Sequence, residues 1–190
     1  MTYVKASVRR PAGNPGNGIQ PKDQLVIYDI DDILSFPPRN DAGVVIEEDI
    51  VMKAGRYAIG IYLTPGTAEI SSNSDGETDA EGYTPSIKFN HPGNEQEIRE
   101  FKTNWLSKKC IVVLRYCSGK PADLIGTPCN PCKLSVSYTG SNESNTNELT
   151  FTQISKGDDI AIYRGTDTLE EPVAVVEAGA TDIDYQTDGQ

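Results

Sequence analysis

The sequence predicts a single, mainly β domain, resembling a sandwich or barrel, with one flanking α-helix. Short apolar runs rich in β-branched and aromatic residues recur along the chain, separated by turn residues. Only one segment, about residues 94–107, has apolar residues at helical spacing. With 190 residues, the chain is long enough for one domain with a substantial core, together with arms.

The first half of the chain is expected to contain an N-terminal arm, four short strands and one polar, acidic segment. Residues 1–22 are basic and rich in Gly, Pro and Asn, which predicts a flexible N-terminal arm before a domain at 23–166. Residues 70–84 are polar and acidic, which indicates an exposed loop or a long protruding hairpin. The other apolar runs of this half predict strands at 25–30, 44–46, 50–53 and 56–64.

The one expected helix begins after a turn at Pro92-Gly93. Asn94 is a suitable N-cap, and Glu97 completes a capping-box pattern. Acidic residues lie early in the segment and lysines lie late, which suits the helix dipole. The apolar stripe predicted to face the core consists of Ile98, Phe101, Trp105 and Leu106.

The second half again reads as strands. Residues 110–116 are almost continuously apolar, which predicts a strand buried on both faces. Residues 134–138 alternate between apolar and polar, as a half-buried strand does. A further pair of strands is expected at 149–154 and 160–163. An acidic C-terminal tail then covers residues 167–190, with one apolar patch at 173–176.

The charge balance argues against a protein that grips nucleic acid. The chain has 28 Asp and Glu residues against 17 Lys and Arg, a net charge of -11, whereas affinity for phosphates comes mainly from Lys and Arg. The same charge suits a surface that lets DNA pass without adhesion, and it also suits simple solubility. The sequence has no apolar run of membrane-spanning length and no secretory signal at its start, so we expect a cytosolic protein with reduced thiols.

The sharpest catalytic pattern is an apolar strand that ends in Asp29-x-Asp31. It resembles the first motif of haloacid-dehalogenase-like phosphotransferases, in which one aspartate is the nucleophile and the other transfers protons. That fold needs alternating helices and parallel strands, and only one good helix is expected here. The favoured interpretation is an acidic turn after a strand.

Other candidate ligands are equally sparse. Cys129 and Cys132 have the spacing of half a zinc site, which would need Cys117 and one more ligand, while Cys110 and Cys117 are expected on opposite faces of one strand. The acidic loop 73–79 does not follow the order of an EF-hand. The single histidine, His91, is expected to bond the backbone in a turn. We therefore predict no catalytic residue, no cofactor-binding residue and no metal ligand.

An ordered set of short segments extends over roughly residues 25–165. It resembles a family of tail proteins encoded by phages and prophages of Bacteroidetes, and is most similar to a major tail (tail tube) protein. The matching segments are Ile27-Tyr28, Ser35-Phe36-Pro37, Tyr62-Leu63-Thr64-Pro65, Thr67-Ala68-Glu69, Gly82-Tyr83-Thr84-Pro85-Ser86, His91-Pro92-Gly93-Asn94, Glu97-Ile98, Glu100-Phe101, Leu124-Ile125-Gly126-Thr127-Pro128, Asn130-Pro131 and Tyr138-Thr139-Gly140.

The resemblance implies a non-enzymatic structural protein of the virion. Its subunits would self-assemble into stacked rings, with inner strands of neighbours joined into one barrel around a channel that conducts the genome. Its partners would be further copies, other tail and head–tail joining proteins, and DNA that passes without specific binding. It would assemble in the bacterial host cytoplasm, insert into no membrane and need no cofactor. Alternatives are a head–tail connector ring, a capsid decoration or baseplate protein, and a carbohydrate-binding adhesion sandwich.

Overall fold

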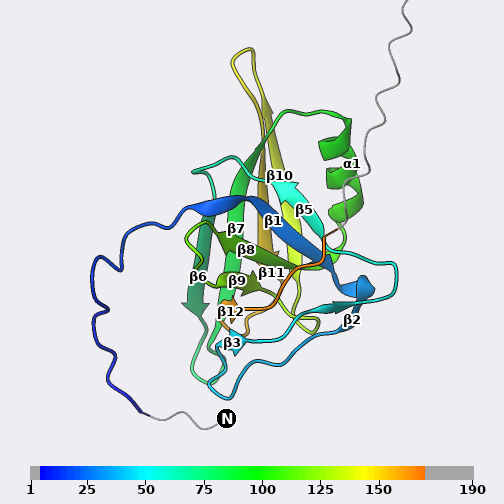
Figure 1. Cartoon of the computed structure of the whole chain (residues 1–190). Helices are drawn as coiled ribbons and strands as arrows, with labels where there is room; N and C mark the ends of the chain where they lie inside the picture. Colours follow the sequence, from blue (N-terminus) through cyan, green and yellow to red (C-terminus); the bar gives the residue numbers. More distant parts are fainter. Residues whose placement is uncertain (1–4, 170–190) are drawn as a thin grey trace, which may run out of the picture.

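A sheet of ten strands dominates the computed structural model, which describes residues 5–169 (Figure 1). One short helix, α1 (Gln96–Trp105), flanks it, and within the described residues the sheet does not close into a barrel. The predicted mainly β class with one flanking helix is therefore confirmed. The ten strands are β1 (Pro21–Asp29), β3 (Val45–Ile46), β5 (Ile59–Tyr62), β6 (Glu69–Asp75), β7 (Gly82–Pro92), β8 (Lys109–Tyr116), β9 (Ala122–Ile125), β10 (Cys132–Gly140), β11 (Asn145–Gln153) and β12 (Ala161–Tyr163).

The sheet divides at its central strand, β8. One edge of β8 pairs antiparallel with β1, which in turn pairs with β5. The other edge pairs with β10 at its start and with β9 further along. Two branches leave this edge, β9–β12–β3 and β10–β11–β7–β6, and the β12–β3 pair is parallel. A separate two-stranded sheet joins β2 (Ile33–Ser35) to β4 (Val51–Met52), and a 3-10 turn at Ile30–Asp32 links β1 to β2.

The two faces of β8 face two separate hydrophobic clusters. Val112 and Leu114 belong to the first cluster, with residues of β7, β10, β11 and α1. Ile111 and Val113 belong to the second, with residues of β9 and β12. Side chains alternate across a strand, so a strand buried on both faces must be apolar at every position. The prediction of a doubly buried strand at 110–116 is confirmed for residues 110–114; Arg115 and Tyr116 are half-buried.

The helix packs its apolar stripe against the first cluster. Ile98 is buried, and Phe101 and Trp105 are partly buried with their rings stacked at 5.6 Å between centroids. Leu106 is 54% exposed at the end of the helix, so its predicted place in the stripe is wrong. The helix ends at Trp105, and Leu106 is its C-cap residue.

The predicted cap of this helix is wrong. The N-cap residue is Glu95, which makes no side-chain capping bond. The Asn94 side chain instead accepts a hydrogen bond from Lys102 Nζ at 3.2 Å. Lys102 also donates to Asn147 Oδ1 at 2.6 Å, and Asn147 is completely buried. Asn94 is thus engaged by a bridge from the helix to β11, which leaves no capping box with Glu97.

Replacing Trp105 by alanine should lower the free energy of unfolding by about 2 kcal/mol. This is less than the ~3–5 kcal/mol typical of a fully buried tryptophan, because part of the ring stays in contact with water. Urea unfolding followed by circular dichroism measures the loss. The exposed neighbour supplies the control, and L106A should change stability by less than about 0.5 kcal/mol. A loss of the same size in both variants would contradict this packing.

Two features of the second half differ from expectation. Residues 122–125, for which the sequence predicts no strand, form β9 between β8 and β12. Strands β11 and β12 exist where predicted, yet they do not pair with each other: β11 lies between β10 and β7, while β12 lies between β9 and β3. The half-buried strand expected at 134–138 lies within β10, as predicted.

The segment 70–84 adopts the hairpin alternative. Strands β6 and β7 pair from Glu69 opposite Lys88 to Asp75 opposite Gly82, with a turn at 76–81. At the domain's end, Asp167 and Leu169 contact the second cluster. The apolar patch at 173–176 lies outside the described residues, and the division into arm, domain and tail stays a prediction.

Candidate functional site

The aspartates of the strongest catalytic pattern are engaged in local structure. Asp29 ends β1, and its Oδ1 accepts a hydrogen bond from the backbone N–H of Asp31 at 3.1 Å. Its other carboxylate oxygen pairs with Lys108. Asp29 thereby caps the 3-10 turn and ties β1 to the end of the helical segment. This placement fits the interpretation as an acidic turn after a strand.

The four cysteines fall into two classes. Cys110 and Cys132 are buried and lie directly opposite each other on β8 and β10, a pairing that their spacing in sequence does not indicate. Cys117 and Cys129 are exposed, and Cys117 Sγ donates to Pro21 O. Among residues 5–169, no three His, Cys, Asp or Glu side chains are grouped in a way that could hold a metal ion. Cys129 and Cys132 thus differ in burial despite their close spacing.

Only two of the four thiols should react rapidly with a thiol reagent in the native state. Burial raises the pKa of Cys110 and Cys132, in the latter to about 12, so both stay protonated and covered at neutral pH. Titration with Ellman's reagent should count Cys117 and Cys129 at once and all four thiols in denaturant. Fast labelling of a third thiol in the native chain would contradict this burial.

His91 and the acidic segment 73–79 have structural contacts. His91 lies in β7, so its predicted place in a turn is wrong. Its Nδ1 lies 2.9 Å from Tyr62 O, which confirms the expected bond to the backbone. Asp75, at the end of β6, pairs with Lys156 at 3.1 Å and accepts from the N–H of Gly76. The Asp75 carboxylate is therefore bonded both to the turn of its own hairpin and to the loop that contains Lys156.

The features that remain are open strand edges. Within the described residues β6 pairs only with β7, β5 only with β1, and β3 only with β12. The outer edge of β3 is closed by Asn40, whose N–H donates to Val45 O and whose side chain accepts from the N–H groups of Val44 and Val45. The outer edges of β6 and β5 present backbone groups that no described strand covers. Such edges are templates for pairing with another chain, and natural proteins cover them or use them.

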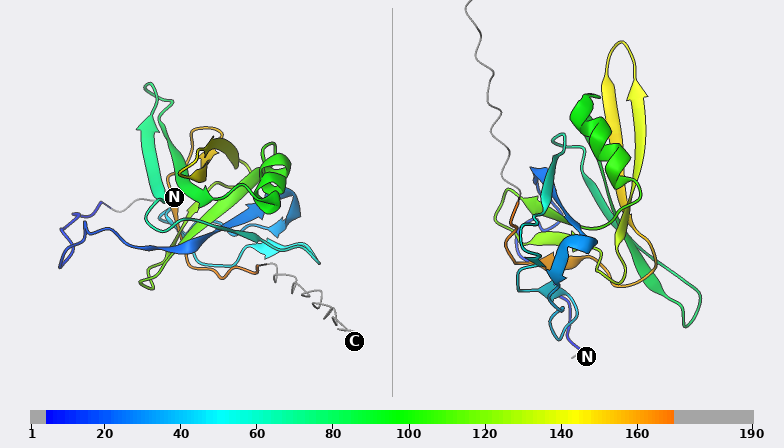
Figure 2. Two further views of the ribbon diagram at one scale, coloured as in Figure 1. Left: turned by 90° about the horizontal axis from the view of Figure 1, so that it is seen from above. Right: turned by 90° about the vertical axis from the view of Figure 1, so that its right-hand side faces the viewer.

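Two long hairpins extend from the body of the molecule in opposite directions (Figures 1 and 2). The β10–β11 hairpin passes beyond the helix, and its end from Ser137 to Ser144 is exposed. The β6–β7 hairpin leaves the opposite end, with its turn at 76–81. Neither hairpin tip contributes to a hydrophobic cluster, so the extensions do not stabilise the isolated core.

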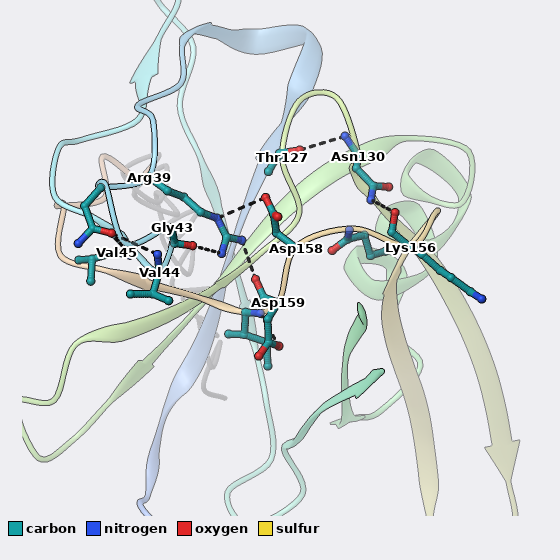
Figure 3. A network of polar contacts seen from close by, with 12 residues as sticks. Arg39, Gly43, Val44, Val45, Thr127, Asn130, Lys156, Asp158 and Asp159 are labelled. Atoms are coloured by element: carbon teal, nitrogen blue, oxygen red, sulfur yellow. Dashed lines mark hydrogen bonds and ion pairs between the residues drawn. The ribbon is translucent and has the colours of Figure 1, made fainter. Parts of the chain in front are cut away.

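A polar network holds the loops that contact the β6–β7 hairpin (Figure 3). Arg39 donates to Gly43 O at 3.0 Å and to Asp159 O at 2.6 Å, and its Nε lies 3.8 Å from Asp158 Oδ2. Ser72 of β6 donates to the Asp159 carboxylate. Arg39 therefore joins the loop before β3 to the loop after β11, on which the hairpin rests. Sequence reasoning did not single out Arg39, since a lone arginine after two prolines carries no pattern.

Asn130 holds the other side of the same network. Its side chain donates to Ser155 O at 2.7 Å and accepts from the Ser155 N–H at 3.0 Å. The neighbouring Gly157 exchanges two backbone hydrogen bonds with Tyr83 on β7, at 2.9 and 3.0 Å. The loop 155–159 is thus held by Asn130 on one side and supports the hairpin on the other.

The chain matches no protein-family model, no curated protein and no solved structure with which it was compared. No helix of the described residues has the length and apolar character needed to cross a membrane.

Proposed function

We propose that this chain is a phage tail tube subunit that self-assembles into stacked rings around a DNA-conducting channel. The proposal rests on the ordered resemblance to major tail proteins of Bacteroidetes phages and prophages, and on the open surfaces of the fold. Its partners are further copies of the same chain, other tail proteins and head–tail joining proteins. The virion tail is then its place of action, after assembly in the host cytoplasm.

The observation that carries the proposal is the set of uncovered strand edges at the ends of the sheet. Strands β6 and β5 each have one neighbouring strand among the described residues. A strand edge gains hydrogen bonds when a second strand joins it, and identical subunits that join head to tail close into a ring when the rotation allows it. Lateral pairing of this kind supports a ring of many copies.

The two hairpins supply the second direction of assembly. They extend to opposite ends of the molecule (Figure 2), so a ring of copies presents one set of tips on each face. Contacts between the tips of one ring and the body of the next stack rings into a tube. The tips add nothing to either hydrophobic cluster of the single chain, and contacts with an assembly partner would account for their length.

The acidic character of the chain fits a conduit for DNA. The net charge of -11 gives a surface that repels phosphate groups, and a channel through which DNA must slide benefits from weak contacts. The polar contacts of Asp29, His91 and Cys117 described above are local bonds that stabilise the fold, as expected of a structural subunit.

Sedimentation velocity with a shortened hairpin tests the stacking of rings. Replacing residues 140–145 by Asn-Gly joins Thr139 to its hydrogen-bonded cross-strand neighbour Thr146 through a two-residue turn. The full chain should sediment as large, heterogeneous assemblies that grow with concentration. The shortened variant should keep its fold and stop at single rings.

The matched control is S137A on the same hairpin, which should assemble like the unaltered chain. A full chain that remains a monomer at every concentration, and that binds a glycan column, would overturn the proposal in favour of the adhesion alternative. A shortened variant that forms the same large assemblies would contradict a role of the β10–β11 hairpin in stacking the rings.

A further inference from the structure

Two segments of the described chain are extended, unpaired and opposite in charge. The first is the arm before β1, which contains Lys5, Arg9 and Arg10 and no acidic residue up to Lys22. The second is the outer edge of β6 together with the acidic turn that follows it, where Glu77, Asp79 and Glu81 form no ion pair with a described residue. Glu69 and Asp75, at the two ends of β6, pair with Lys88 and Lys156. In a chain of net charge -11, this basic arm is the exception that needs a partner.

The arm makes no contact with its own domain until it reaches β1. Residues 5–18 are all exposed, and Val8 is 98% exposed. Its hydrogen bonds are internal: Arg10 donates to Gly13 O, and the Asn17 N–H donates to Asn14 O. The views in Figures 1 and 2 place it clear of the sheet. A short extended segment with one apolar side chain gains most by joining a strand edge.

The edge of β6 alternates in a way that matches the arm. Ile70 and Ser72 are half-buried on one face of the strand, whereas Ser71 and Asn73 are exposed on the other. In the arm, Ala6 and Val8 alternate with Lys5, Ser7 and Arg9. Pairing Ser7 with Ser71 places the small and apolar arm residues beside the half-buried face and the basic residues beside the exposed face.

We propose that residues 5–10 of one copy add as an extra strand to the outer edge of β6 in a second copy. The strand order then continues from β7 and β6 to the partner's arm, and its basic side chains approach the acidic residues of that hairpin. The occupant is a second copy because the arm leaves its own domain unpaired, and because in a ring every copy offers one arm and one edge. This inference rests on the proposed function.

The pairing of Ser7 with Ser71 does not depend on strand direction. In a parallel register Ala6 and Val8 lie opposite Ile70 and Ser72, and in an antiparallel register the order reverses around the same central pair. Directly opposed residues have Cα atoms about 4.5–5.5 Å apart, within the range that a disulfide bridges. A cysteine at each position therefore tests the contact in either direction.

The experiment co-expresses two differently tagged full-length chains, one with S7C and the other with S71C. Both carry C117S and C129S, which remove the exposed native thiols. Mild copper-catalysed oxidation should give a band that carries both tags. Such a band requires a disulfide between the cysteine of one copy and the cysteine of another. The matched control replaces S71C by S135C, at an exposed position of β10, and it should give no such band.

Charge reversal provides a second readout. R9E with R10E on the S7C chain should lower the yield of the crosslink severalfold at low salt, and added salt should lower the yield of the original pair. An unchanged yield would show that charge does not guide the arm, which would overturn the proposed complementarity.

Three other outcomes separate this inference from the proposed function. A crosslink found only inside a single chain that carries both cysteines would place the arm on its own β6 edge and overturn exchange between copies. Rings or tubes without a crosslink would overturn the arm's place and leave the tube function standing. A monomer without a crosslink would overturn both.

Discussion

Replacing Asp167 by alanine should lower the free energy of unfolding by about 3 kcal/mol. The Asp167 side chain is 6% exposed, accepts a hydrogen bond from Tyr28 at 2.5 Å and pairs with Arg115. Removing one partner of a buried ion pair typically costs ~3–5 kcal/mol, because the other charge stays buried and unpaired. The lower end applies here because Arg115 is 28% exposed and also bonds Gly165 O at 2.7 Å.

Urea unfolding monitored by circular dichroism measures this loss. The control is D158A, which removes a 3.8 Å pair with Arg39 in which the aspartate is 74% exposed. Pairs this exposed contribute about 0–1 kcal/mol, so the control should remain close to the unaltered chain. Equal losses in the two variants would mean that Asp167 does not anchor the end of the domain.

Replacing Phe151 by alanine should have the largest effect in the core, about 3–5 kcal/mol. Phe151 is fully buried on β11, and its ring stacks on that of Phe89 on β7 with centroids 6.3 Å apart. Both rings belong to the first cluster, which joins the long branch of the sheet to β1 and β8. The substitution leaves a cavity that rigid strands on either side cannot fill.

Thermal melting of F151A and F151L tests this account of the core. F151L keeps most of the apolar volume and should lose less than the alanine variant. The exposed residue Glu148 on the same strand supplies the control, and E148A should shift stability by less than about 0.5 kcal/mol. A small loss for F151A would contradict a core that the long branch shares with β1 and β8.

The parts of the fold that follow from the sequence are those in which one segment carries its own pattern. Residues 110–114 are apolar at every position because both faces of β8 are covered, and such a run has few other interpretations. The helix is likewise visible in the spacing of Ile98, Phe101 and Trp105. In both elements the spacing of apolar residues along the sequence directly indicates which side chains are buried in the fold.

Other parts depend on contacts between distant segments. Residues 122–125 have an aspartate among three apolar residues and no clear strand pattern, and β9 exists because β8 and β12 bond it on both sides. Asn94 has the chemistry of a helix cap, but its side chain accepts from Lys102, which also donates to the buried Asn147. The opposition of Cys110 and Cys132 likewise arises from strand pairing across 22 residues. No local pattern carries such information.

The open edges illustrate the same limit for the candidate site. The sequence indicated a hairpin or loop at 70–84 and a basic arm at 1–22. Which edge of the hairpin lacks a neighbour depends on the order of β6, β7 and β11 in the sheet. The arm and the edge become candidate partners only when the fold shows both to be unpaired.

The central claim is that this chain assembles into a hollow tube, and negative-stain electron microscopy of the purified protein tests it most directly. We expect rings and filaments with a stain-filled central channel, and we expect their number per micrograph to rise with protein concentration. Uniform single particles of monomer size at all concentrations and salt conditions would contradict it.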